Sequence, residues 1–120
     1  MTKDEKAAAL AEAFGWRRLK GGVADFVQSD GTLMILGYRG WHPFDDIVLA
    51  KMVQEEMLNR GYCTGTDARL GGGWFAYFEK ELLEESAGIA RPTEAEAICE
   101  AAGRVLGLWK EDASDEEARL

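Results

Sequence analysis

The chain has 120 residues, of which 47% are hydrophobic and 30% are charged, and its formal net charge at pH 7 is −8. This composition suits one globular domain with a core of its own, which excludes global disorder, and no apolar run reaches the roughly 20 residues of a membrane span. Because the net negative charge repels phosphate backbones and anionic lipids, we expect neither nucleic acid nor a membrane as a direct partner.

A short amphipathic helix is predicted at the start of the chain. Thr2 and Glu5 have the spacing of a capping box, in which each side chain accepts a hydrogen bond from the backbone N–H group of the other residue. Gly15 ends the pattern, since glycine commonly terminates a helix. The apolar face of this helix would consist of Ala7, Leu10, Ala11 and Phe14.

Residues 16 to 36 have the pattern of a strand meander. Runs of strand-forming residues flank the Gly21-Gly22 break, and a further pair of runs flanks Asp30-Gly31. Asp-Gly supplies the left-handed dihedral angles that a tight type I′ turn requires. We therefore predict two hairpins in this region, of which the second has the stronger turn signal.

The clearest helix pattern lies between Pro43 and Gly61. We expect Asp45 to be the N-cap, Asp46 to lie at the positive end of the helix dipole, and Gly61 to end the helix. The rest of the chain is expected to cover this helix. Its packed stripe would be Leu49, Met52, Val53 and Met57, whereas Lys51, Gln54 and Glu55 fall on the solvent side.

The second half of the chain predicts strands followed by a last helix. A strand could begin at Tyr62 to Thr64, the glycines 71 to 73 mark a turn, and residues 74 to 79 carry aromatic side chains on both faces, as a strand in the middle of a sheet does. Residues 79 to 91 suggest a strand end followed by a loop. Thr93 begins a second capping box with Glu96. The last helix would bury Ile98, Ala101, Ala102, Val105, Leu108 and Trp109.

These elements together predict an α+β fold with a mainly antiparallel sheet flanked by helices, similar to an α/β/α sandwich. We expect a single domain at residues 1–110 and an acidic, flexible tail at residues 111–120. Cys63 and Cys99 are far apart in the sequence, which favours free thiols in a reducing compartment, although a fold that brought them together could pair them. The charged N-terminus shows no signal peptide.

Catalytic and metal-binding patterns are weak in this sequence. His42 is the only histidine, and Asp45-Asp46 is better explained by capping than by metal ligation. The pairs Glu55-Glu56 and Glu84-Glu85 are adjacent in sequence, so on a helix their carboxylates would point about 100° apart. The glycines 71 to 73 precede a strand, not a helix, and so do not form a phosphate loop. We expect no enzyme activity, no cofactor and no metal site.

The loop before the central helix is the candidate binding site. It combines aromatic area, the only imidazole and a cation beside a helix N-terminus. A basic-aromatic cluster overlaps it, formed by Arg17, Arg18, Lys20 and Arg39 with Trp16, Tyr38 and Trp41 nearby, a composition that can stack on and pair with a nucleotide or an acidic peptide. An ordinary strand with aromatic side chains inside and charged ones outside is the alternative interpretation of that cluster. The candidate binding residues are Tyr38, Arg39, Trp41, His42 and Phe44.

Several segments of the chain, taken together, resemble those of a known family. They are Gly15-Trp16 after the first helix, Trp41-His42-Pro43-Phe44-Asp45-Asp46-Ile47, Gly73-Trp74-Phe75-Ala76-Tyr77-Phe78, and Pro92-Thr93-Glu94-Ala95-Glu96-Ala97-Ile98-Cys99-Glu100-Ala101-Ala102. In these segments the chain is similar to the small phage proteins of the ABA-sandwich family. That resemblance implies a capping residue before the central helix, a place that Asp45 takes here, followed by an acidic residue where this chain has Ile47.

The resemblance further implies a sheet flanked by helices, a bacteriophage or prophage origin, and no catalytic residues to carry over. Phage genomes often carry small acidic proteins that bind host machinery or blunt host defence. We therefore expect a non-enzymatic, acidic protein that binds an unidentified host protein in the bacterial cytosol, for example as an inhibitor of a defence complex.

Three other interpretations stay open at this point. The loop from Tyr38 to Phe44 could bind a nucleotide or another small ligand and act as a sponge for it. His42 could be the centre of an enzyme. If the strand at residues 74 to 78 or the loop at Trp41 exposes its aromatic rings, a homodimer would bury them.

Overall fold

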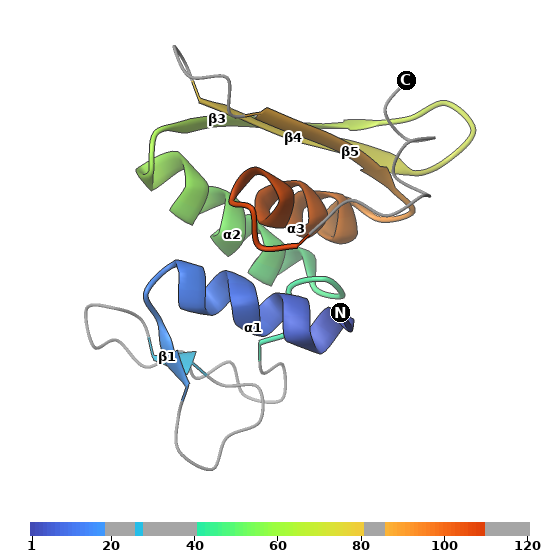
Figure 1. Cartoon of the computed structure of the whole chain (residues 1–120). Helices are drawn as coiled ribbons and strands as arrows, with labels where there is room; N and C mark the ends of the chain where they lie inside the picture. Colours follow the sequence, from blue (N-terminus) through green and yellow to red (C-terminus); the bar gives the residue numbers. More distant parts are fainter. Residues whose placement is uncertain (19–25, 28–40, 81–85, 110–120) are drawn as a thin grey trace.

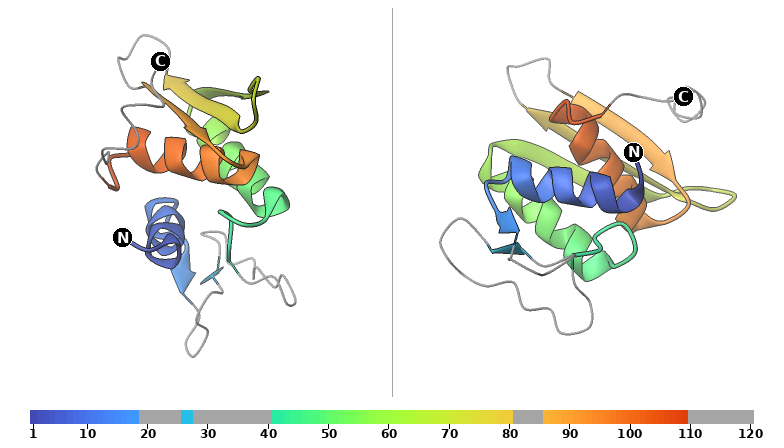
Figure 2. Two further views of the ribbon diagram at one scale, coloured as in Figure 1. Left: turned by 90° about the vertical axis from the view of Figure 1, so that its right-hand side faces the viewer. Right: turned by 60° about the horizontal axis from the view of Figure 1, so that its bottom comes forward.

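The computed structural model describes residues 1–18, 26–27, 41–80 and 86–109, whose elements are stacked in layers (Figure 1). In chain order these elements are α1 (Lys3–Ala13), β1 (Arg17–Arg18), β2 (Phe26–Val27), α2 (Ile47–Asn59), β3 (Tyr62–Ala68), β4 (Trp74–Lys80), β5 (Ser86–Arg91) and α3 (Glu94–Val105). The sheet of β3, β4 and β5 forms one layer, α2 and α3 lie on one face of it, and α1 packs on the other side of these two helices (Figure 2).

The three-stranded sheet is antiparallel throughout and has the order β3-β4-β5. Strand β4 is therefore the middle strand, which confirms the position predicted for the aromatic run. The predicted strand at Tyr62 is also present, and it extends to Ala68. The loop predicted before Arg91 is wrong, because Ser86–Arg91 forms strand β5. The small residues of β5 are weak strand formers by themselves, and their pairing with β4 decides the conformation.

The predicted α+β class is confirmed. The helices that the structure describes all lie on one side of the three-stranded sheet, whereas an α/β/α sandwich has helices on both sides. Side chains on the covered face form the core, and Ala76, Phe78 and Ile89 are completely buried there. Helix α1 packs against α3 instead of the sheet. Two ion pairs accompany this packing, because Lys3 and Lys6 of α1 pair with the carboxylates of Glu96 and Glu100 of α3.

Helix α1 begins with the predicted capping box. The Thr2 hydroxyl accepts a hydrogen bond from the backbone N of Glu5 at 3.1 Å, and the Glu5 carboxylate accepts one from the backbone N of Thr2 at 2.9 Å. Because the Thr2 backbone N–H stabilises the carboxylate form, the pKa of Glu5 lies below its ordinary value. The predicted apolar face of this helix is buried, and it consists of Ala7, Leu10, Ala11 and Phe14.

Helix α2 begins at Ile47, one residue later than the predicted N-cap Asp45 implies. Asp46 is the N-cap, and its Oδ1 accepts a hydrogen bond from the backbone N of Val48 at 2.9 Å. The prediction of Asp45 as the cap is wrong, because the backbone N of Asp45 donates to the His42 carbonyl at 3.1 Å within a turn that precedes the helix. The helix ends at Asn59 with Arg60 as its C-cap, and Gly61, the predicted stop, follows with a φ of 92° in the left-handed region.

The packing of α2 follows the predicted stripe with one exception. Leu49, Val53 and Met57 are completely buried, and Met52 is half-buried. Gln54 was expected on the solvent side, yet only 9% of it is exposed, because β3 lies beside α2 at that place. Its amide Nε2 donates to the hydroxyl of Thr64 on β3 at 3.2 Å, so the buried amide is hydrogen-bonded.

Helix α3 begins directly after its cap, Thr93, and forms one half of the predicted capping box: the Thr93 hydroxyl accepts from the backbone N of Glu96 at 3.2 Å. The Glu96 carboxylate pairs with Lys3 of α1. The helix ends at Val105, and the chain then folds back, with the backbone N of Leu108 donating to the Gly103 carbonyl at 2.9 Å. Leu108 and Trp109 therefore pack against the core from this return segment and do not extend the helical face.

The remaining predicted elements fall partly or wholly outside the described residues. Strands β1 and β2 pair antiparallel, with Arg17 opposite Val27, as the first predicted hairpin requires. The second hairpin, at Asp30-Gly31, and the tail at 111–120 lie outside the described residues. No helix in the described part of the chain is long and apolar enough to cross a membrane.

Candidate functional site

The predicted binding loop is placed in part, and its described aromatic residues belong to the core. Trp41 and Phe44 are 2% and 3% exposed. The indole Nε1 of Trp41 donates to the Ala7 carbonyl at 2.7 Å, and its ring meets that of Trp16 with the centroids 4.9 Å apart. These two rings hold α1 in place and have no free face for a ligand. Tyr38 and Arg39 lie outside the described residues.

His42 is the one member of the predicted set that the structure describes at the surface. Its side chain is 45% exposed, and its Nδ1 lies 3.7 Å from a carboxylate oxygen of Asp4. No group of three or more His, Cys, Asp or Glu side chains among the described residues could hold a metal ion. The described part of the predicted site therefore offers one imidazole and one carboxylate, without the stacking surface that the nucleotide interpretation requires.

A cleft of about 420 Å³ lies at the N-terminal ends of α2 and α3. Lys3 crosses it: its Nζ lies 2.7 Å from a Glu96 carboxylate oxygen and 3.3 Å from Oδ1 of Asp45. The hydrogen bond to Glu96 raises the pKa of Lys3 above its ordinary value. This lysine links α1 to α3 and to the turn before α2.

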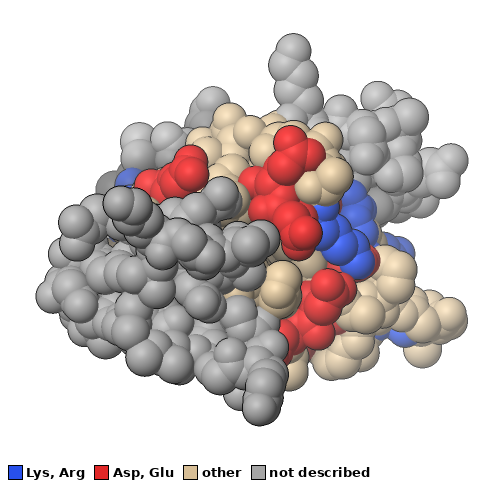
Figure 3. All heavy atoms as spheres, turned by 90° about the horizontal axis from the view of Figure 1, so that it is seen from below, with Lys and Arg blue, Asp and Glu red and all other residues tan. Residues whose placement is uncertain are grey.

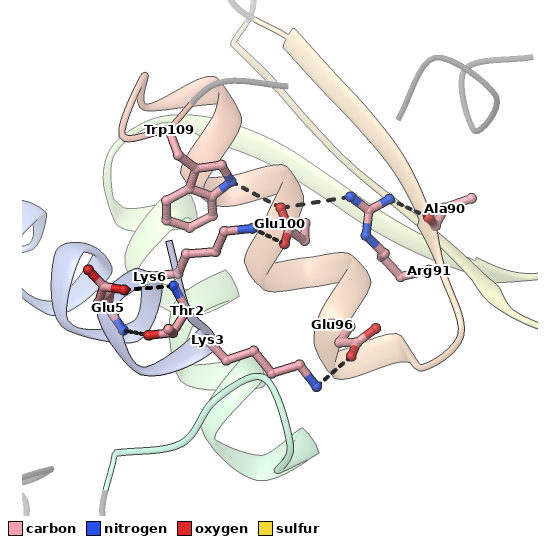
Figure 4. A network of polar contacts seen from close by, with 9 residues as sticks. All are labelled: Thr2, Lys3, Glu5, Lys6, Ala90, Arg91, Glu96, Glu100 and Trp109. Atoms are coloured by element: carbon pink, nitrogen blue, oxygen red, sulfur yellow. Dashed lines mark hydrogen bonds and ion pairs between the residues drawn. The ribbon is translucent and has the colours of Figure 1, made fainter. Parts of the chain in front are cut away.

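Glu100 is the centre of a buried polar network that joins separate parts of the chain (Figure 4). This residue is 7% exposed. One carboxylate oxygen accepts from Lys6 Nζ at 2.6 Å, and the other accepts from the Trp109 indole Nε1 at 3.0 Å and lies 3.9 Å from Arg91 Nη2. The Lys6 ammonium also lies 5.1 Å from the centroid of the Trp109 ring. The network thus connects α1, β5, α3 and the return segment.

The contacts of Glu100 give it a structural role. Two cations and one N–H donor surround a single carboxylate, which leaves little room for a substrate proton or a metal ion. Sequence reasoning did not identify this residue. A signal was present, because Glu100 is the one charged residue in the run from Ala97 to Ala102, whose other members are small or apolar.

Charges of both signs are mixed on the face of the molecule that carries α1 (Figure 3). In the part of this face that the structure describes, the Lys and Arg side chains lie directly beside those of Asp and Glu. The ion pair of Lys3 with Glu96, one helix away, is an example of this mixing. Because neighbouring charges of opposite sign cancel, the described part of this face has no single-sign field that would attract a charged partner.

The other face of the sheet has a different character. Its outward side chains include Phe75 and Tyr77 of β4, and no described helix lies over them. A Cβ atom at Gly65 would lie 2.6 Å from Tyr77 Cε1, and one at Gly88 would lie 2.6 Å from Phe75 Cζ. Each ring therefore leans across a neighbouring strand, over a position that only glycine leaves open. Two carboxylates, Asp67 and Glu79, are exposed on the same face.

The turn between β3 and β4 contains the glycines 71 to 73, as predicted. The backbone N of Arg69 donates to the Gly73 carbonyl at 3.0 Å and closes the hairpin. Leu70 is fully exposed in this turn. Beside it lies an open cleft of about 580 Å³, whose walls come from residues 69 to 73 and 90 to 92.

The two cysteines are free thiols in different environments. Cys63 is exposed on β3, whereas Cys99 is completely buried on α3. Burial, helped by the nearby Glu100 carboxylate, raises the pKa of the Cys99 thiol well above its ordinary value.

We expect a maleimide at pH 8 to modify Cys63 in the folded protein and Cys99 only after unfolding, because the thiolate is the reactive form. Peptide mass spectrometry checks this, and modification of Cys99 in the native protein would contradict it.

The fold and these surfaces define a small α+β domain with an internally paired polar network and an aromatic sheet face over which no described helix lies. The same fold occurs in the crystal structure of a phage protein from Bacillus cereus ATCC 14579, which superposes with a TM-score of 0.65 over 92% of this chain and 93% of that chain. The two sequences are 13% identical, so the likeness concerns the fold alone. No family model and no curated protein matches the chain.

Proposed function

We propose that this chain is a small phage-type protein that acts by binding a host protein and not by catalysis. The observation that carries the proposal is the outer face of the sheet, over which no described helix lies and where Phe75 is half-buried and Tyr77 is 36% exposed. Exposed aromatic side chains are typical of protein-binding surfaces, because they bury a large area at a low cost in conformational entropy. The fold shared with a phage protein supports the phage-type assignment.

The polar groups of the chain support a binding role in a second way. Glu100 and its cationic partners contact one another in the interior, and Lys3 occupies the cleft between the helix ends. Catalytic sites need a polar group that is positioned near a substrate and is not already satisfied by a neighbour. Within the described residues, the side chains that gather together are those that hold the elements in place.

The bacterial cytosol is the proposed place of action, and a host defence complex is the proposed target. Both thiols are free, as a reducing compartment keeps them. An inhibitor of such a complex needs a binding surface and no active site, which agrees with the outer sheet face. A net charge of −8 would also speed the encounter with a basic partner.

Affinity capture from a bacterial host lysate tests the proposed function. The bait is the full chain, and the reference bait is the Tyr77→Ser variant, whose melting temperature is first shown to match that of the wild type. We expect the wild-type chain to retain a host protein in stoichiometric amounts, identified by mass spectrometry. Failure to retain any host protein at micromolar bait concentration would count against a host-binding function.

A further inference from the structure

We propose that the outer face of the sheet binds an extended, arginine-containing segment of a partner protein. The guanidinium groups would stack on Phe75 and Tyr77 and pair with the carboxylates of Asp67 and Glu79. This inference rests on the proposed function and deepens it, because it names the surface and the chemistry of the partner.

The rings on this face are arranged for stacking. Because Gly65 and Gly88 have no side chains, Tyr77 and Phe75 lean over them and rest on the backbone of the neighbouring strands. The atoms at the tip of each ring are the ones that approach the glycines, and the Tyr77 side chain keeps part of its surface exposed. A guanidinium group is planar and can stack on an accessible aromatic ring, and arginine does so more readily than lysine.

Carboxylates flank the rings on the same face. Asp67 of β3 is directly opposite Phe75 of β4, a relation that places their Cβ atoms about 5 Å apart. Glu79 follows Tyr77 by two residues along β4, which corresponds to about 7 Å. Both carboxylates are exposed. The Lys and Arg residues within the described strands of this sheet belong to the covered face: Lys80 lies over the Tyr62 ring, and Arg91 lies near Glu100. One exposed cation, Arg69, follows β3 directly in the turn to β4, so Asp67 has a neighbouring positive charge and Glu79 lies at the other end of the face.

The charge of the face selects one class of partner. A nucleic acid that stacked its bases here would bring phosphates against Asp67 and Glu79, and a second copy of the chain would bring its own carboxylates. A cationic segment brings no negative charge against Asp67 and Glu79 and so avoids both repulsions. It also meets a chain whose net charge is −8. Complementary charge therefore favours a basic protein segment over the other two occupants.

The spacing of the face selects an extended conformation. Phe75, Tyr77 and Glu79 are alternate residues of one strand, so the groups that would contact a partner repeat every two residues. A partner in an extended conformation repeats its side chains at the same interval. A segment with arginine at every second position would place successive guanidinium groups beside Asp67 and Phe75, over Tyr77, and beside Glu79.

Fluorescence anisotropy with defined peptides tests the proposal. The probe is a labelled eight-residue peptide of alternating Thr and Arg, and the comparison peptides carry Lys or Glu in place of Arg. We expect the wild-type chain to bind the Arg peptide, to bind the Lys peptide several-fold more weakly, and not to bind the Glu peptide. The double variant Asp67→Asn/Glu79→Gln should weaken binding at least about tenfold, and Tyr77→Ser about fivefold.

A matched control removes the same charge elsewhere. Glu12→Gln/Glu55→Gln neutralises two exposed carboxylates on α1 and α2 and should change the affinity less than about twofold. Circular dichroism establishes that every variant is folded. Equal weakening by the control pair, or no binding of the Arg peptide up to millimolar concentration, would overturn the proposal. Tighter binding of an eight-nucleotide oligomer, or dimerisation that depends on Tyr77, would overturn it as well.

The outcome separates this inference from the proposed function. If the wild-type chain retains a host protein and Tyr77→Ser retains it equally, the sheet face is the wrong surface and the host-binding function stands. If the Arg peptide binds as expected and no host protein is retained, the surface and its preference for a cationic segment are correct, and the host-binding function is wrong.

Discussion

Replacing Glu100 by glutamine is expected to lower the free energy of unfolding by about 2 kcal/mol. The substitution keeps the size of the side chain but removes the charge that Lys6 and Arg91 face, at a place where 9% of the side chain is exposed. Two cations would then lie near each other in the interior without a carboxylate between them. Urea unfolding followed by far-UV circular dichroism measures the change.

The control for this prediction lies one turn earlier on the same helix. Glu96 also pairs with a lysine of α1, at 2.7 Å, but its side chain is 20% exposed and that of Lys3 is 53% exposed. Solvent screens this pair, so Glu96→Gln should cost less than about 1 kcal/mol. Equal losses for the two substitutions would show that burial of the Glu100 network does not determine its contribution to stability.

Gly103→Ala is expected to destabilise the fold by about 2 kcal/mol, although alanine is the better helix former by about 1 kcal/mol. Gly103 lies inside α3, and a Cβ atom there would overlap the indole ring of Trp109. The ring must then leave α3, and its hydrogen bond to Glu100 is lost. Thermal unfolding measures the effect, and acrylamide quenching of tryptophan fluorescence should increase as Trp109 becomes accessible.

A double-mutant cycle isolates this steric cause. With Trp109→Ala already present, no ring lies over position 103, so Gly103→Ala should be neutral or stabilising by up to about 1 kcal/mol. The sign of the effect of Gly103→Ala therefore depends on Trp109. The same loss of stability in both backgrounds would mean that something other than the ring opposes a side chain at this position.

Local chemistry allowed several elements to be predicted from the sequence. The caps at Thr2 and Thr93 depend on residues three positions apart, and the end of α2 depends on the left-handed conformation of Gly61. The middle position of β4 followed from its aromatic side chains on both faces. Each of these signals is contained within a few residues, which is why no tertiary information was required.

The errors have tertiary causes. Asp45 and Asp46 are equally good caps by residue type, and the turn after His42 decides between them. Gln54 is polar, yet the position of β3 beside α2 buries it. Strand β5 exists because β4 pairs with it. None of these neighbours can be identified from a local pattern.

The candidate site was the least predictable part for the same reason. An aromatic loop has the same composition whether its rings face a ligand or the core, and Trp41 and Phe44 face the core. The polar network depends on Lys6 and Glu100, which are 94 residues apart in the chain. The outer sheet face depends on which side of β4 the helices cover, and periodicity within a strand does not contain that information.

The glycines that lie beneath aromatic rings have a consequence for protein engineering. A common route to a more stable protein is to replace glycines in helices and strands by alanine. At Gly65, Gly88 and Gly103 that route would fail, because an aromatic ring from elsewhere in the chain occupies the space that a Cβ atom would need. In a library that varies each glycine together with the aromatic residue over it, we expect the stable variants to combine a small residue at one of the two positions with a large residue at the other. Replacing the glycine alone should give unstable variants.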